Sequence, residues 1–276
     1  MASTNNTKGN GHPAPAEELP LPPPETETSL ANQAIMLGET ILTIQAGGTP
    51  VYGILQRSRA MTSQSDYFRL QFRGYAKAEG QHWVMLDGDD SRFHAVYNLA
   101  WVRVDRPSKT VTFGPKGGIQ CSPGMTGSGL DTYLFANVIN WAKGVCPEYA
   151  ISPGMVSIGQ PPTEDERVQK HAFYAGQAFQ FEWQDPAQRT GLYFKDKVSK
   201  LLGVWNKDSV KEFGGEDMLK TLSGLDESRA ELQAQMERLE NAHESMSRAL
   251  QKEKSTSQIL TGVLILVALI AIWAVI

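Results

Sequence analysis

Basic charge, cysteine and a secretory leader are scarce or missing in this sequence, and each shortage excludes a class of protein. Lys and Arg number 26 against 30 Asp and Glu, which gives a formal net charge of −4. Nucleic-acid binding through a basic surface is therefore disfavoured on electrostatic grounds. The first residues contain no apolar stretch of the kind found in secretory signals. Cys121 and Cys146 are the two cysteines, and we expect free, buried thiols in a reducing compartment.

Motifs of common metal and nucleotide sites are missing too. The sequence holds no CxxC and no HExxH. Residues 87–90, Asp-Gly-Asp-Asp, lack the spaced ligands and final Glu of a calcium loop. Residues 114–118 contain Gly and Lys without the spacing of a phosphate-binding P-loop. We expect both segments to be turns.

A long apolar run is present instead. Residues 259–276 read ILTGVLILVALIAIWAVI and carry no charge, and as a helix they would span roughly 27 Å, close to the hydrocarbon thickness of a bilayer. Arg248, Lys252 and Lys254 precede the run, as the positive-inside tendency predicts. We expect a single-pass anchor over 257–276 that binds membrane lipid and leaves the N-terminal domain in the cytoplasm. The identity of the membrane stays open.

Composition divides the rest of the chain. Residues 1–28 are rich in Pro, Ser, Thr and Glu, and we expect a disordered tail because they can bury little apolar area. Residues 29–205 suffice for one globular domain. Residues 206–215 contain Gly214 and Gly215, which favour a hinge. A stalk over 216–256 follows.

The stalk carries a seven-residue repeat, which we name the heptad seam. Its first stripe is Met218, Leu225, Leu232, Leu239 and Met246. The complementary positions hold Leu222, Arg229, Met236, His243 and Leu250. Such a repeat is typical of a coiled coil, so we predict self-association through 216–254. A single amphipathic helix docked on the domain or on lipid is the alternative.

Apparent strands and helices in the globular part alternate in a readable order. A short helix over about 30–37 precedes several β-branched and aromatic segments between 40 and 114. Helices are expected over 130–143 and 163–177, with a strand over 149–158 between them and strands at 179–183 and 191–195 after them. The fold class predicted is α/β (α+β), a mixed, mainly antiparallel sheet flanked by helices.

Residues 109–195 carry two short motifs, one at the start of the first expected helix and one at the end of the second. Thr126-Gly127-Ser128-Gly129-Leu130-Asp131, followed by Thr132, opens the first of these helices, and Phe173-Tyr174-Ala175-Gly176-Gln177-Ala178-Phe179 ends the second. This order resembles the second half of the GNAT acyltransferase superfamily. The resemblance implies that backbone amides at 127–132 hold the pyrophosphate of acetyl-coenzyme A at a helix N-terminus. It also implies that Tyr174 is the general acid to the departing thiolate.

Two departures from the family pattern leave the activity open. Thr126 stands where the family has Arg or Gln, and Asp131 stands where it has a small residue. A like charge about 4 Å from a phosphate costs on the order of 1–4 kcal/mol near a surface. One hypothesis is a degenerate, non-catalytic domain, without cofactor, that binds a protein partner. The other is a membrane-tethered N-acyltransferase using acetyl-coenzyme A, with His171 as a candidate base three residues before Tyr174.

Overall fold

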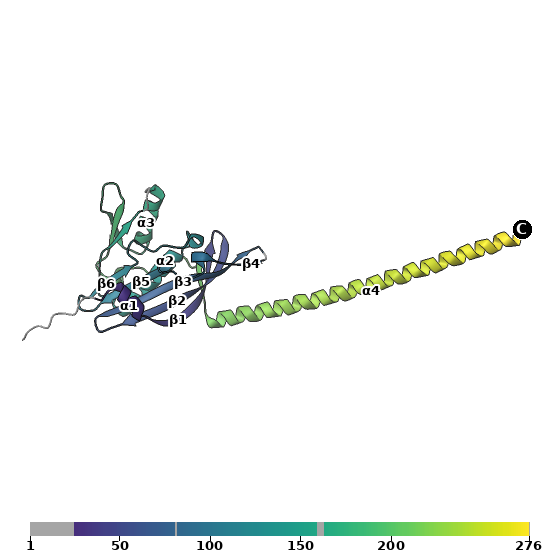
Figure 1. The fold of residues 1–276 in the computed structure, drawn as a ribbon, viewed down its shortest axis with the longest axis horizontal. Coiled ribbons are helices and arrows are strands. Elements are labelled where there is room, and N and C mark those ends of the chain that lie inside the picture. Colours follow the sequence, from purple (N-terminus) through teal and green to yellow (C-terminus); the bar gives the residue numbers. More distant parts are fainter. Residues whose placement is uncertain (1–24, 81, 159–162, 276) are drawn as a thin grey trace, which may run out of the picture. The chain divides into compact units, whose positions relative to one another are not determined.

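A computed structural model of the chain describes residues 25–80, 82–158 and 163–275, without the side chains at 268, 269, 271 and 273–275 (Figure 1). It divides into two compact units, one that ends at Glu212 and one that starts at Phe213. The Pro-rich segment expected to be disordered falls largely outside the described residues.

A long antiparallel meander forms the centre of the first unit. Strands β1 (Ile35–Ala46), β2 (Thr49–Met61) and β3 (Ser65–Glu79) pair in sequence, and Gly47 and Gly48 turn the chain between the first two at positive φ. The far end of β3 pairs with β4 (His82–Met85), and its beginning pairs with β5 (Leu99–Asp105). Strand β6 (Thr110–Gly114) then pairs with β5.

The sheet closes with one parallel step. Helix α2 (Leu130–Val145) connects β6 to β7 (Ala150–Ile151), and these two strands run parallel. The spatial order is β11-β1-β2-β3-β5-β6-β7, where β11 is Val210–Phe213. A mainly antiparallel sheet flanked by helices, as predicted, is therefore confirmed.

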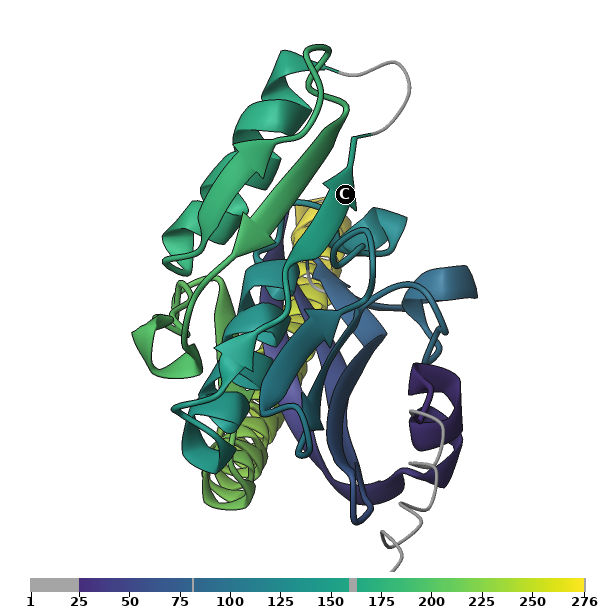
Figure 2. The same cartoon turned by 90° about the vertical axis from the view of Figure 1, so that its left-hand side faces the viewer.

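A second, three-stranded sheet follows. Strand β8 (Gly154–Ser157) leaves the large sheet and pairs with β10 (Thr190–Phe194), which also pairs with β9 (Gln180–Trp183). Helix α3 (Glu164–Gly176) lies beside this small sheet in Figure 2. Three short 3₁₀ turns complete the described part of the unit: η1 (Gly88–Asp90), η2 (Pro123–Met125) and η3 (Val198–Lys200).

Apolar side chains on both faces of the large sheet are covered. Phe68 and its neighbours along the sheet join α2 in the main core, whereas Tyr67, one residue earlier, belongs to a smaller cluster with Leu30 and Trp101. Successive strand residues point to opposite faces, so α1 (Glu27–Gln33) covers the face away from α2. Figure 2 shows these two helices on opposite sides of the sheet.

Two predicted boundaries were wrong. The first helix ends at Gln33 rather than near residue 37, because Ile35, Met36 and Leu37 begin β1. Part of the segment assigned to a hinge, 206–215, forms β11 at the edge of the large sheet. The backbone N–H of Gln45 in β1 donates to the carbonyl of Ser209, just before β11, at 2.9 Å, so sheet pairing outweighs the local glycine signal.

The second unit is one long helix, α4 (Gly215–Val275). Its described Leu and Met side chains from Leu219 to Leu250 are exposed. Among the described residues, no helix combines the length and the apolar character that a membrane crossing needs. Several side chains of the expected anchor, 257–276, lie outside that description.

Candidate functional site

The loop before α2 is built around two left-handed glycines. Gly127 has φ +73° and Gly129 has φ +79°, a conformation that side chains with a Cβ rarely adopt. Between them the buried Ser128 donates its hydroxyl to the carbonyl of Met125 at 2.7 Å. The resulting turn places Gly129 at the N-cap of α2. The sequence-predicted segment 127–132 is therefore a loop that opens a helix.

The chain's own atoms bond the first backbone amides of α2. The N–H of Leu130 donates to the Ser128 hydroxyl at 3.3 Å, and the N–H of Thr132 donates to the Asp131 carboxylate at 2.7 Å. The N–H of Tyr133 donates to the Gly129 carbonyl at 3.0 Å. The Asp131 amide faces the Cys121 thiol. The amides of Leu130, Thr132 and Tyr133 at this positive helix end are thus already paired within the chain.

Asp131 also changes the chemistry of its surroundings. Burial raises the pKa of the Cys121 thiol to about 12; the Asp131 carboxylate adds to the rise and the Asp131 amide opposes it. A thiol with so high a pKa is protonated at neutral pH and is a poor nucleophile. A groove of about 590 Å³ beside the helix end is lined by Gly127, Gly129, Thr132, Gln169 and Trp205 among others, and Asp131 is the charged member of that described lining.

Tyr174 lies among aromatic rings near the end of α3. Its ring stacks on Tyr193 with centroids 4.1 Å apart and meets Phe135 edge-on. Burial and then the neighbouring Tyr193 raise the pKa of Tyr174 well above its ordinary value. The hydroxyl lies over Gly118, where an added Cβ would come within 3.3 Å of it. A phenol in this setting holds its proton firmly.

Tyr174 and Asp131 share a cavity, whereas His171 lies elsewhere. The cavity measures about 120 Å³ and is also lined by Gly118, Gln169 and Lys170. Asp131 and Tyr174 come from separate helices, so the fold brings together two positions from the two motifs. The exposed His171 packs its ring edge-on against Phe181, with centroids 5.4 Å apart, and does not line this cavity.

Sequence reasoning missed a cleft between β6 and β8. Strand β7 pairs with β6 through Ala150 and Ile151, and after Pro153 the chain continues as β8 in the small sheet. A cavity of about 450 Å³ lies where the strands separate. Tyr193 enters this region: its hydroxyl donates to the Phe113 carbonyl at 3.2 Å, and a Cβ at Gly154 would lie 2.1 Å from its ring.

A sequence signal for this arrangement exists in the glycines. Gly154 lies opposite Tyr193 in the small sheet, and the ring of Phe181, two residues from the strand partner of Gly191, lies over Gly191. A glycine facing an aromatic residue on the next strand marks a ring lying across the backbone. Within the described residues, no group of three His, Cys, Asp or Glu side chains is placed to hold a metal ion. No protein-family model, curated protein or solved structure matches the chain.

Proposed function

We propose that the first unit is a GNAT-like domain that has lost coenzyme binding and acts as a protein-binding module. In this proposal the chain self-associates through 216–254. Residues 257–276 anchor it to a membrane and leave the domain in the cytoplasm. The order β6, α2, parallel β7, then α3, β9 and β10 supports the GNAT-like part. The apolar sequence of 259–276, with basic residues before it, supports the tether.

One observation carries the loss of coenzyme binding: the internal pairing of the amides that open α2. A pyrophosphate there would have to displace the Ser128 hydroxyl and the Asp131 carboxylate from backbone donors. It would also approach a carboxylate, with no basic residue among the described lining of the adjoining groove. These features oppose the binding of a pyrophosphate at this turn, whereas Lys170 lines the neighbouring cavity that Asp131 shares.

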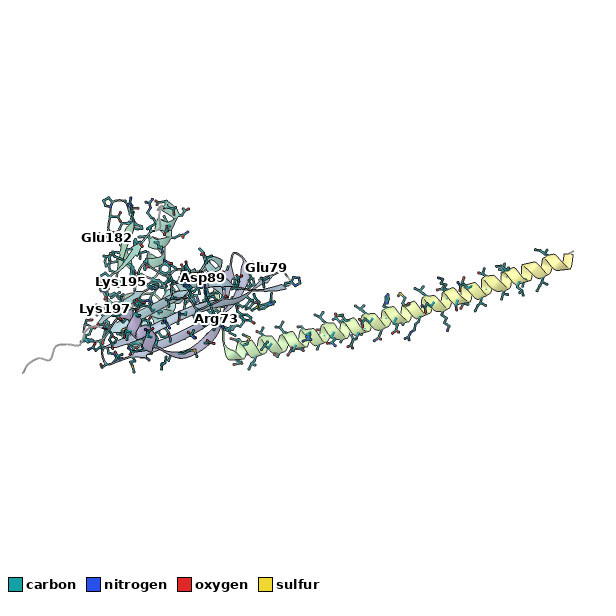
Figure 3. The ribbon with its side chains drawn as sticks, in the orientation of Figure 1. Arg73, Glu79, Asp89, Glu182, Lys195 and Lys197 are labelled. Carbon is teal, nitrogen blue, oxygen red and sulfur yellow. The ribbon has the colours of Figure 1, made fainter. Side chains whose placement is uncertain are left out.

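An exposed strand edge supports the protein-binding part. Among the described strands, β4 pairs with β3 alone, so its other edge offers unpaired backbone groups. Trp83 and Met85 are exposed on it, and the Trp83 ring packs on Tyr52 with centroids 4.5 Å apart. In Figure 3, Glu79 marks the tip where β3 meets β4. An apolar open edge of this kind accepts an added strand from a partner.

The rival function is the membrane-tethered N-acyltransferase. The observation that favours it is the cavity shared by Tyr174 and Asp131, near the β6–β8 cleft. In this function Asp131 would have to turn away from the Thr132 amide when coenzyme binds. The two functions therefore differ in what Asp131 does.

Calorimetry of the full chain in detergent micelles tests the proposal. Acetyl-coenzyme A at millimolar concentration should produce no binding heat with the native chain. Thr126→Arg combined with Asp131→Gly should create measurable binding, because a cation is added and the amides are released. Thr126→Arg with Asp165→Asn is the matched control, since it makes a similar charge change on α3.

Native binding that Gly129→Glu abolishes would overturn the proposal and favour the acyltransferase. Asp131→Asn then separates charge from occupancy, because the amide oxygen can still accept from Thr132 while the negative charge is gone. If Asp131→Asn alone gained weak binding of acetyl-coenzyme A, the negative charge of Asp131 would be the main reason that the native chain does not bind the coenzyme.

A further inference from the structure

Most apolar side chains of the heptad seam on α4 are exposed, and we expect another surface to cover them. Figure 3 shows the described side chains of this helix extending outward from it. The Leu and Met members of the seam from Leu222 to Leu250 have exposed fractions between 52% and 70%. Helices in water gain most of their stability by packing an apolar face. A periodic stripe of this length is therefore expected to pack on another surface.

The heptad positions identify that surface as a second copy of the seam. If Leu225 is assigned to heptad position d, the rest of the first stripe also falls at position d: Met218, Leu232, Leu239 and Met246. Position a then falls on Leu222, Arg229, Met236, His243 and Leu250. Position d is thus apolar throughout, and interdigitating a and d side chains is what a matching helix provides.

The polar residues at position a favour two strands. Arg229 lies in the middle of the a stripe, and Asp226 precedes it by three residues on a neighbouring helical face. A single charged a residue specifies register and oligomer state at some cost in stability. In a two-stranded coil the long stem of Arg229 can pack in the seam while its guanidinium reaches solvent. A third helix would bury the guanidinium further.

The flanking charges favour parallel orientation. In the antiparallel alignment that overlaps the whole seam, Leu225 faces His243 of the other copy, and the e positions then bring Asp226 beside Glu240 of the other copy, twice per pair. In the parallel alignment the flanks pair Thr221 with Asp226 and Gln235 with Glu240. The parallel form therefore avoids these two acid–acid contacts. It places Arg229 beside Arg229 of the other copy, where each guanidinium can reach solvent and Asp226 of its own helix.

We propose that α4 pairs with α4 of a second copy of this chain as a parallel, in-register, two-stranded coiled coil over residues 218–250. The inference deepens the self-association in the proposed function and rests on it. It joins two copies of the preceding domain to one end of a coil. A binding edge on that domain would be presented twice, which raises the effective concentration for a multivalent partner.

Cysteine cross-linking of the full chain in detergent micelles tests orientation and register. In a Cys121→Ser, Cys146→Ala background, Leu225→Cys should form a covalent dimer with itself under mild oxidation, because facing d residues lie within disulfide reach. Met246→Cys should do the same at the other end of the seam, which guards against local misfolding of either variant. Glu227→Cys, on the outer face, is the matched control and should remain monomeric on a denaturing gel.

A mixture of Leu225→Cys and His243→Cys chains identifies the opposite orientation. A cross-link between the two variants, with none between identical chains, would mean antiparallel pairing and would overturn the proposal. Sedimentation equilibrium of the native chain in density-matched detergent supplies the strand number, and a dimer is expected. A trimer would refute the two-stranded coil alone, whereas a monomer at high micromolar concentration would refute self-association itself.

Discussion

Leucine has opposite environments in the two units of this chain. Leu134 of α2 is fully buried, whereas Leu232 of α4 has an exposed fraction of 62%. The first unit covers both faces of its sheet with its own helices, so its core residues are buried within one copy. The helix α4 repeats apolar residues every seven positions without such cover. The difference is what the proposed pairing of α4 with a second copy would account for, since the first unit has a buried core of its own.

Removal of a core ring should give the largest effect and should leave association untouched. Phe135 is buried between Phe113, Phe173 and Phe179. Phe135→Ala should lower the free energy of unfolding of the first unit by about 3–5 kcal/mol, because it removes apolar contacts and leaves a cavity. Chemical denaturation followed by tryptophan fluorescence measures the loss. An unchanged unfolding midpoint would mean that this ring is not part of a packed core.

Shortening the seam should reverse that pattern. Leu232→Ala with Leu239→Ala should weaken association by about 2–5 kcal/mol for each leucine layer, by analogy with buried leucine truncations. The unfolding midpoint of the first unit should not move. Sedimentation in detergent measures the association, and Asn241→Ala on the outer face is the matched control. Equal effects of the seam and control variants would argue against a coiled coil.

The comparison also shows where sequence reasoning succeeded. The helix over 216–256 was predictable because the seven-residue repeat depends on spacing alone. Helix α2 was predictable because Leu130, Leu134 and Val138 share a helical face and Pro147 lies beyond its end. The order of elements from β6 to β10 followed from such local signals, except that the single strand expected over 149–158 is two strands, β7 and β8, in separate sheets.

Long-range pairing was the part that sequence could not supply. The return of residues 210–213 to the edge of β1 depends on a partner more than 160 positions away. In the site, Asp131 was recognised as an unusual acid, but its bond to the Thr132 amide and the contact between Cys121 and the Asp131 amide depend on the folded geometry. Tyr193 was missed because nothing local links it to Phe113.

The native cysteines, which both lie in the first unit, should react far more slowly near neutral pH than a cysteine placed on α4. Burial raises the pKa of Cys146 to about 11, with the Asp66 charge adding to the rise, and that of Cys121 to about 12. At pH 8 each native cysteine of the folded chain should react with a thiol reagent at least roughly 100-fold more slowly than in the unfolded chain, because the thiolate is the reactive form.

A cysteine introduced on α4 by Glu227→Cys should react rapidly and serves as the control. The raised pKa values also fix the sign of the linked stability. Their contribution is complete below the ordinary thiol pKa of 9.0 and is lost as pH rises from 9 through 11 to 12. Fast labelling of both native cysteines at pH 8 would contradict their burial.

Charge removal within the first unit should have a smaller but measurable effect. Asp66 is fully buried and accepts from Arg59 at 2.8 Å through Nε and 2.6 Å through Nη2. Because Arg59 is partly exposed, solvent screens the pair, and we expect Asp66→Asn to cost about 1–3 kcal/mol of unfolding free energy. Thermal or urea unfolding measures it. A stabilised variant would show that burial of the carboxylate outweighs its bonds.

The matching change on α4 should be nearly silent. The Glu244 carboxylate accepts a hydrogen bond from the Arg248 guanidinium at 2.5 Å. Arg248 lies one helical turn after Glu244, and both side chains are largely exposed. Glu244→Gln should alter helix stability or association by no more than about 0.5 kcal/mol, since solvent and salt screen such pairs. Circular dichroism and sedimentation at two salt concentrations measure the change. Glu244 occupies an outer b position in the assigned register, beside His243 of the seam. A large effect would place Glu244 at an interface and would require a different register for the coil.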